Sequence, residues 1–202
     1  MTTLLLIRHG QSSTNAGRVF TGQLDVPLTD TGKEQAEKTA DFLRQRWEID
    51  RIYASDLCRA RDTAECLSAV LGQQITCLPG LREMDAGHWT GRRLADISRE
   101  EPEAFSLWQQ DIGRAVCPGG ESVAELSRRI RDTLEQIAYQ SCGKTAAVFT
   151  HATPIQAMQA MLRFGSLENM KQYRSVGNAS VTVLYHRSSG WTFGPVGMDG
   201  HL

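Results

Sequence analysis

The chain has 202 residues, of which 41% are hydrophobic and 22% are charged, so it can bury a sizeable core as one domain. Its 22 basic and 23 acidic residues give a formal net charge of -1, which excludes a global positive field that would attract nucleic acid or an anionic membrane. We therefore expect a single domain over residues 1–202 without either partner.

Cysteines and apolar runs give two further expectations. The five cysteines include no CxxC pair, so we expect free thiols in a reducing compartment. The N-terminal apolar run, residues 4–7, is too short for a secretory signal, and no apolar stretch is long enough to span a bilayer. The prediction is a cytoplasmic protein. No apolar stripe stands apart from the core faces, so the sequence predicts no particular oligomeric state.

The first predicted elements are a strand and a helix. Residues 4–7 form a continuous apolar run before Gly10, as in a central strand covered on both faces. Residues 28–47 then place apolar side chains at helical spacing. Thr31 and Glu34 are the predicted capping box of this helix.

Residues 51–72 repeat the scheme. A short strand through Ile52 and Tyr53 is followed by a helical pattern for which Ser55 is the predicted N-cap. Gly72 is the expected end of this helix. A strand around "QITCLP", residues 74–79, comes next.

The middle of the chain departs from this alternation. Residues 84–120 mix Gly, Pro and charge with short helical fragments, so we predict an insertion there that lies over the sheet and covers the active site. Residues 121–138 return to a clear amphipathic pattern, with Ser122 and Glu125 as its capping box.

The last third of the chain completes an α/β fold. "TAAVFTHATP", residues 145–154, predicts a buried strand and then a helix with Pro154 in its first turn. Residues 179–186 and 191–196 form a predicted hairpin. Strands that alternate with helices predict a three-layer α/β/α sandwich, with a mostly parallel central sheet and an antiparallel edge.

Two strands of this fold end in a histidine and a small residue. "LLLIRHG" ends in His9, and "AAVFTHA" ends in His151. Ligands of parallel sheets bind beyond the carboxyl ends of the strands, so we expect both histidines to face one pocket, with Arg8 and Arg59 at the same edge. Two histidines, two arginines and the backbone N–H groups of helix N-termini are typical of a phosphate site.

Six segments together resemble the histidine phosphatase superfamily, in its phosphoglycerate mutase-like branch. They are "RHGQSSTN", "DVPLTDTGKEQA", "YASDLCRARDTAE", "LREMDAGHWTG", "GGES" and "VFTHA", which occur in this order over most of the chain. Their ordered occurrence is far more specific than the RHG triplet alone. The resemblance implies the phosphoglycerate mutase-like fold and a phosphomonoesterase.

The resemblance also implies roles for individual residues. His9 would be the nucleophile that carries the phosphoryl group, and Glu83 would be the proton donor. Arg8, Arg59 and His151 would surround the transferred group. The implied phosphate-binding residues of lesser weight are Gln11, Asn15, Thr21, Gly22 and Ala152.

Two features depart from the family pattern or invite another interpretation. Ala152 stands where the second histidine motif usually continues with glycine, and Gln11 stands where glutamate is frequent. Asp85 and His88 lie near Glu83, but their spacing fits no strong metal signature. We expect neither a metal nor a cofactor.

Three functions remain open at this point. The leading one is hydrolysis of a small phosphate ester, similar to that of bacterial alpha-ribazole phosphatases or broad-specificity phosphatases. A mutase is the nearest alternative, for which Arg92 and Arg93 would bind a second anion. A non-catalytic module that binds phosphate or phosphopeptides is the third. Trp89 and Trp108 either cover the substrate or pack the insertion.

Overall fold

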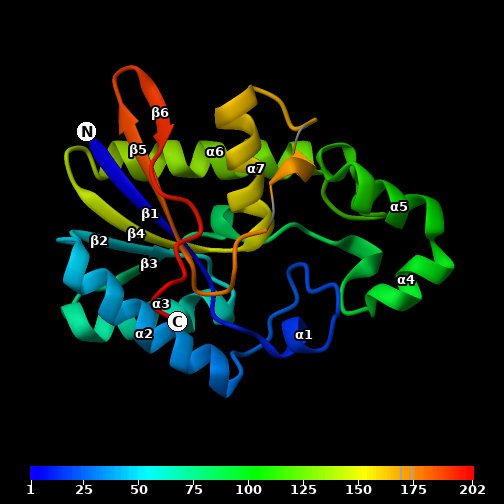
Figure 1. Cartoon of the computed structure of the whole chain (residues 1–202), viewed down its shortest axis with the longest axis horizontal. Coiled ribbons are helices and arrows are strands. Elements are labelled where there is room, and N and C mark those ends of the chain that lie inside the picture. The colour runs from blue at the N-terminus through cyan, green and yellow to red at the C-terminus, as the bar shows by residue number, and fades with distance from the viewer. Residues whose placement is uncertain (169, 174) are drawn as a thin grey trace.

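A computed structural model describes residues 1–168, 170–173 and 175–202. Within them, a six-stranded sheet has the order β3-β2-β4-β1-β5-β6 (Figure 1). Neighbouring strands among β1 to β4 pair in parallel, whereas β5 and β6 form an antiparallel edge. The predicted sheet is thus confirmed. The strands are β1 (Thr2–Arg8), β2 (Arg51–Ala54), β3 (Ile75–Cys77), β4 (Thr145–Thr150), β5 (Val181–Arg187) and β6 (Gly190–Phe193).

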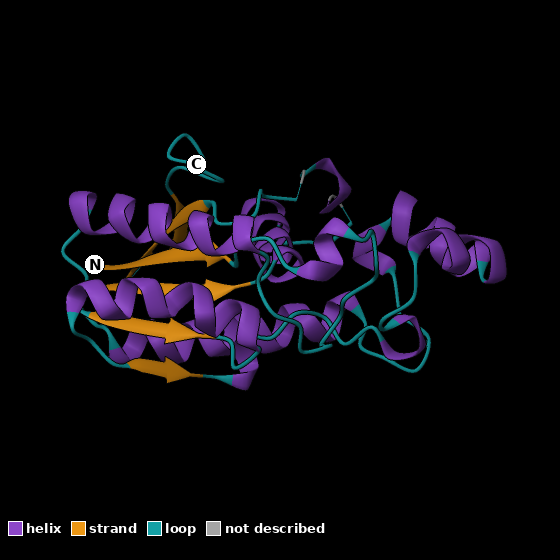
Figure 2. Cartoon of the chain, turned by 90° about the horizontal axis from the view of Figure 1, so that it is seen from below, coloured by secondary structure: helices purple, strands orange, loops and turns teal. Residues whose placement is uncertain are grey.

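Helices cover both faces of the sheet. Leu5 of β1 points to the face on which α2 and α3 pack, and Leu4 points to the face covered by α6 and α7 (Figures 1 and 2). This alternation confirms the expected three layers. The helices are α1 (Ser13–Ala16), α2 (Asp30–Arg46), α3 (Cys58–Leu71), α4 (Leu94–Glu100), α5 (Pro102–Gln110), α6 (Val123–Gln140) and α7 (Ala152–Phe164). Across the described residues, every helix is too short or too polar to cross a membrane.

Several predicted helix ends are confirmed. α3 ends at Gly72, which has the left-handed φ of 64°. At the start of α6, the Ser122 hydroxyl accepts the Glu125 N–H at 3.1 Å, and the Glu125 carboxylate accepts the Ser122 N–H at 2.9 Å. Pro154 lies in the first turn of α7. Local sequence suffices for these ends because cap and partner lie within a few residues of each other.

The predicted capping box of Thr31 and Glu34 is wrong. α2 begins earlier, and Thr29 is its N-cap, with a hydroxyl that accepts the Gly32 N–H at 3.0 Å. The backbone N–H of Thr29 donates to the carbonyl of Gln11 at 2.9 Å, and its hydroxyl also donates to the Gln11 side chain. This long-range contact determines where the helix begins.

Residues 84–120 lie beyond the carboxyl ends of the strands, with α4 and α5 farthest from the sheet (Figure 2). Their apolar side chains form a cluster around the completely buried Trp89, together with side chains of α6 and α7. The Trp89 ring packs edge-on against Phe20 and Trp108, at centroid distances of 5.3 and 6.3 Å. Its indole N–H donates to Glu101 at 3.0 Å. Both tryptophans therefore pack the insertion together.

Candidate active site

The carboxyl ends of β1 and β4 bring two histidines together. The strands pair with Arg8 opposite Thr150, so His9 and His151 follow at neighbouring positions. Their rings lie 5.1 Å apart between centroids, and both side chains are buried. The expected placement at neighbouring strand ends is confirmed, while the chemical roles of the two histidines stay predictions.

Hydrogen bonds determine the protonation of His9. Nδ1 lies 2.7 Å from the carbonyl oxygen of Gly10, to which only a protonated nitrogen can donate. Nε2 accepts the Nε–H of Arg59 at 3.3 Å. Burial and then the positive charges of Arg59 and Arg8 hold the pKa of His9 well below its ordinary value. His9 is therefore a neutral imidazole with its lone pair on Nε2.

His151 contacts a residue that the sequence analysis placed elsewhere. Its Nε2 lies 2.9 Å from the Ser55 hydroxyl, so Ser55 belongs to this site, and the prediction that it caps α3 is wrong. The first amide of α3, that of Cys58, instead donates to the Asp25 carboxylate at 2.7 Å. Burial and the charge of Arg59 hold the pKa of His151 well below its ordinary value.

Both arginines are held by backbone carbonyl groups. The Arg59 guanidinium, 1% exposed, donates to the carbonyls of Leu24 at 2.8 Å and Gly22 at 2.9 Å. Arg8 donates to the carbonyl of Val176 at 2.6 Å, and its buried Nε has no partner within the described part of the chain. These acceptors are neutral, so the hydrogen bonds leave the positive charge of each guanidinium in place, as an anion site requires.

Two residues that the sequence analysis missed connect the strand end to its surroundings. The Thr63 hydroxyl accepts the Gly10 N–H at 3.0 Å and donates to the Arg59 carbonyl at 2.6 Å. The Asn178 side chain donates to the His9 carbonyl at 3.0 Å. A Cβ on Gly10 would lie 2.4 Å from a backbone oxygen of α2, so only glycine fits there. Thr63 lies inside the segment "YASDLCRARDTAE" but was not singled out there, and no local motif marks Asn178.

The carboxylate of Glu83 lies beside the start of α7. It accepts the backbone N–H of Met84 at 2.8 Å and that of Thr153 at 3.3 Å. Burial lowers the pKa of Arg8 and that of Arg59. The negative charge of Glu83 acts in the opposite direction and raises both pKa values. The charge of Glu83 therefore acts on both arginines.

The residues with predicted lesser roles are engaged in the loops around the pocket. The Gln11 side chain accepts from Thr29, and Asn15 accepts from Asn178 at 3.2 Å. Thr21 donates to Thr14 at 2.7 Å.

Backbone groups of two further residues face the site. Gly22 supplies its carbonyl to Arg59, and its φ of 51° favours glycine. Ala152 is the first residue of α7, directly after His151. Phosphate contacts for the five residues of lesser weight stay predictions.

The structure also shows the side chains of the insertion that were considered as ligands of a second anion or of a metal. Arg92 forms ion pairs with Glu100 at 2.6 Å and Glu101 at 2.5 Å, whereas Arg93 is exposed at the start of α4. Asp85 accepts the Gly87 N–H at 3.0 Å. The residues that the structure describes contain no group of three or more His, Cys, Asp or Glu side chains arranged to hold a metal.

The pocket therefore combines four elements of phosphoryl chemistry. Two arginines supply fixed positive charge, and the first turn of α7 supplies backbone N–H groups. A neutral imidazole presents a lone pair, and the Glu83 carboxylate lies beside the start of α7. An anionic tetrahedral group suits this combination of positive charge, backbone N–H donors and a lone pair.

Comparisons with known proteins agree with this chemistry. The model of the histidine phosphatase superfamily (branch 1) matches residues 4–197. Phosphoserine phosphatase 1 of Hydrogenobacter thermophilus is 30% identical over 92% of this chain and 87% of its own length. A probable phosphoglycerate mutase, GpmB of Yersinia enterocolitica, is 30% identical over 100% and 95%. The structure of a candidate alpha-ribazole-5'-P phosphatase from Escherichia coli has a TM-score of 0.86 and 25% identity, over 98% of this chain and 96% of that one.

Proposed function

The chain belongs to the histidine phosphatase superfamily and is a phosphoric monoester hydrolase, and we propose that it transfers the phosphoryl group of its substrate to Nε2 of His9. The observation that carries the proposal is the state of this imidazole. Its proton is held on Nδ1 by the Gly10 carbonyl, and burial beside Arg8 and Arg59 lowers its pKa. Nε2 is therefore an unprotonated nucleophile at neutral pH.

The proposed reaction has two steps that share one carboxyl group. First, Nε2 of His9 forms a bond to phosphorus, the ester P–O bond breaks, and Glu83 gives a proton to the departing oxygen. Second, water attacks phosphohistidine while Glu83 takes its proton. The P–N bond breaks, which releases inorganic phosphate and restores neutral His9.

Arg8, Arg59 and His151 stabilise the transferred group in this proposal. The guanidinium groups lie where the equatorial oxygens gather negative charge, which is where phosphoryl transfer gains most of its stabilisation. In this proposal the Ser55 hydroxyl, 2.9 Å from Nε2 of His151, donates to it and so leaves the proton on Nδ1, which has no protein partner among the described residues. This N–H then donates to a phosphoryl oxygen, as does the backbone N–H of Ala152.

The proposed substrate is a small phosphorylated metabolite with a single phosphate group, of the class to which phosphoserine and alpha-ribazole-5'-P belong. A mutase must also hold a second anion of its substrate. Arg92 is taken up by Glu100 and Glu101, which favours hydrolysis over that activity. The likeness to the Yersinia mutase makes it the second candidate. Release of inorganic phosphate from phosphoglycerate, without isomerisation, would distinguish the two.

The proposal includes metal-independent turnover in the cytoplasm. The two arginines and the α7 amides supply the positive field that a divalent ion supplies elsewhere. The five cysteines are free, consistent with a reducing compartment.

Trapping of the intermediate tests the proposed mechanism. Brief reaction with a 32P-labelled phosphomonoester in the presence of EDTA, followed by quenching with base, should give an acid-labile, base-stable label. Peptide mapping should place it on His9, and His9→Asn should abolish it. A label on His151 or on a serine, or no label unless a divalent ion is added, would overturn the mechanism.

A further inference from the structure

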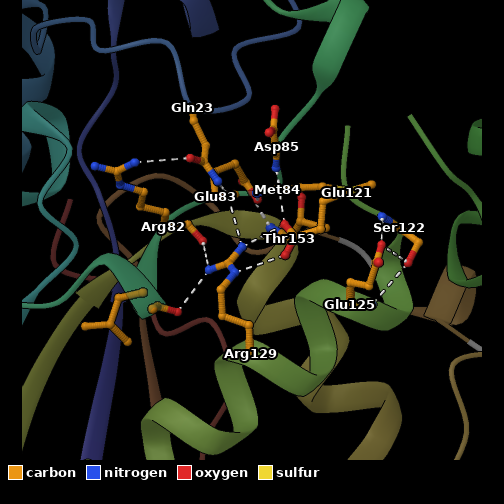
Figure 3. A network of polar contacts seen from close by, with 12 residues as sticks. Gln23, Arg82, Glu83, Met84, Asp85, Glu121, Ser122, Glu125, Arg129 and Thr153 are labelled. Atoms are coloured by element: carbon orange, nitrogen blue, oxygen red, sulfur yellow. Dashed lines mark hydrogen bonds and ion pairs between the residues drawn. The ribbon is translucent and has the colours of Figure 1, made fainter. Parts of the chain in front are cut away.

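Arg129 of α6 uses every N–H donor of its guanidinium group. Nε donates to the Glu121 carboxylate at 3.0 Å, and one Nη2 hydrogen donates to its second oxygen at 2.7 Å. Nη1 donates to the carbonyls of Gly80 and Arg82, both at 3.0 Å, and Nη2 also donates to the carbonyl of Glu83 at 3.3 Å. Five donors thus meet five acceptors around one half-buried side chain (Figure 3).

The three carbonyl acceptors belong to the segment that contains the proposed acid, Glu83. We name residues 80–86 the acid loop and residues 118–121 the glycine loop. The Glu121 carboxylate also accepts the Asp85 N–H at 3.3 Å, and the Glu121 N–H donates to the Asp85 carbonyl at 2.9 Å. A Cβ on Gly120 would lie 2.4 Å from that carbonyl. Arg129 therefore joins α6, the acid loop and the glycine loop at one point.

Contact with Arg129 restricts how Glu83 can lie. Its carbonyl accepts from Arg129 and, at 3.1 Å, from the Gln23 side chain, so its peptide plane is held on one side. Its carboxylate is held on the other side by the backbone N–H of Thr153, at the start of α7. The carbonyl carbon and the side chain of Glu83 are both bonded to its Cα. A rotation of this peptide plane would therefore move the carboxylate in the pocket.

We propose that Arg129 is a positioning residue for proton transfer by Glu83. It does not touch the substrate site in this proposal, which rests on the proposed function of Glu83. The ion pair with Glu121 and the planar guanidinium hold the acid loop in the position at which the carboxyl group of Glu83 meets the leaving oxygen. Lysine has three donors on a flexible stem, so it cannot reproduce the five contacts.

The leaving group of the substrate separates positioning from general support. Aryl phosphates with weakly basic leaving groups need little protonation, whereas alkyl phosphates need it fully. A misplacement of about 1 Å costs up to about 100-fold in rate. Arg129→Lys should therefore lower kcat/KM for alkyl phosphates by about 10- to 100-fold, and that for 4-nitrophenyl phosphate by less than about threefold. Inhibition by inorganic phosphate, which reports the arginines and histidines, should be unchanged.

The experiment is completed by introducing Glu83→Gln both into the wild type and into the Arg129→Lys variant. If Arg129 acts through Glu83, Arg129→Lys should have no further effect on alkyl phosphates once Glu83 is glutamine. Arg128→Lys, on the exposed side of the same helix, is the matched control and should match the wild type. Equal losses for both classes of ester, or an undiminished loss in the Glu83→Gln background, would overturn the proposal.

A second variant covers failure of Arg129→Lys to fold. Glu121→Gln keeps the guanidinium and weakens its bidentate pair, so it should show a smaller loss of the same selective kind. A nonselective loss in this variant would overturn the proposal in the same way. If Glu83→Gln itself lowers kcat/KM, which reports the first step, equally for alkyl and aryl esters, the proposed function of Glu83 as acid fails, whatever Arg129 does.

Discussion

The two sides of the pocket are held by different kinds of interaction. His9 and His151 stand at the ends of paired strands, so the backbone hydrogen bonds of β1 and β4 set the distance between them. Glu83 lies on the acid loop, outside any helix or strand, where the side chains of Arg129 and Gln23 hold its carbonyl. The distance between the two histidines can change only if the pairing of β1 and β4 changes. The position of Glu83 can change when a single side chain, such as that of Arg129, is replaced. The proposed protonation of the leaving group by Glu83 is therefore the step that we expect single substitutions around the acid loop to change.

The largest expected effect comes from removing the proton that Glu83 donates in the proposed mechanism. Glu83→Gln should slow hydrolysis of alkyl phosphates by about 10²–10⁴-fold, because alkoxides leave only when protonated. Aryl phosphates should lose much less in the first step and show a burst of phenol, since the attacking water then lacks a base. Stopped-flow assays of both ester classes measure this. Asp85→Asn, an exposed neighbour, is the control. Equal loss without a burst, with a lower melting temperature, would make Glu83 a structural residue.

The next largest effect concerns the strand-end side of the pocket, that of His9 and His151, and should not depend on the leaving group. Arg59→Ala removes a buried charge beside Nε2 of His9 and should lower kcat/KM by about 10²–10³-fold for alkyl and aryl esters alike. Steady-state kinetics and the inhibition constant of phosphate measure it. Arg61→Ala, exposed on the same helix, is the matched control. A loss confined to alkyl esters would erase the distinction between the two sides.

The smallest effect is the pH dependence of stability on the strand-end side. The folded protein lowers the pKa of His9 and His151, so below about pH 6.5 the unfolded chain binds more protons than the folded one. The free energy of unfolding should be highest above this pH and should fall on acidification, by at most about 1.4 kcal/mol per pH unit for each group.

Denaturant unfolding between pH 7.5 and 5 checks this expectation. His151→Gln should reduce the slope, and sulfate, a dianion that offsets the charges of Arg8 and Arg59, should do so too. An unchanged slope in His151→Gln would show that the cost of charging the imidazole is met by relaxation of the pocket.

The sequence by itself determined the strands and their histidines. A fully apolar run such as residues 4–7 has one favourable environment, a strand covered on both faces, and parallel strands bring their carboxyl ends to one edge. Capping of α6 by Ser122 was likewise predictable, because cap and partner are three residues apart. These interactions are local or repetitive, so a short pattern contains them in full.

Only the tertiary structure decided the contacts between distant segments. Ser55 contacts His151 instead of capping α3, and Asp25, 33 residues before Cys58, supplies the cap. Arg129 meets the carbonyl of Glu83 from 46 positions away. Hydroxyl, carboxylate and guanidinium groups accept many partners of similar energy, and the choice among them depends on which segments the packed core brings within about 3 Å.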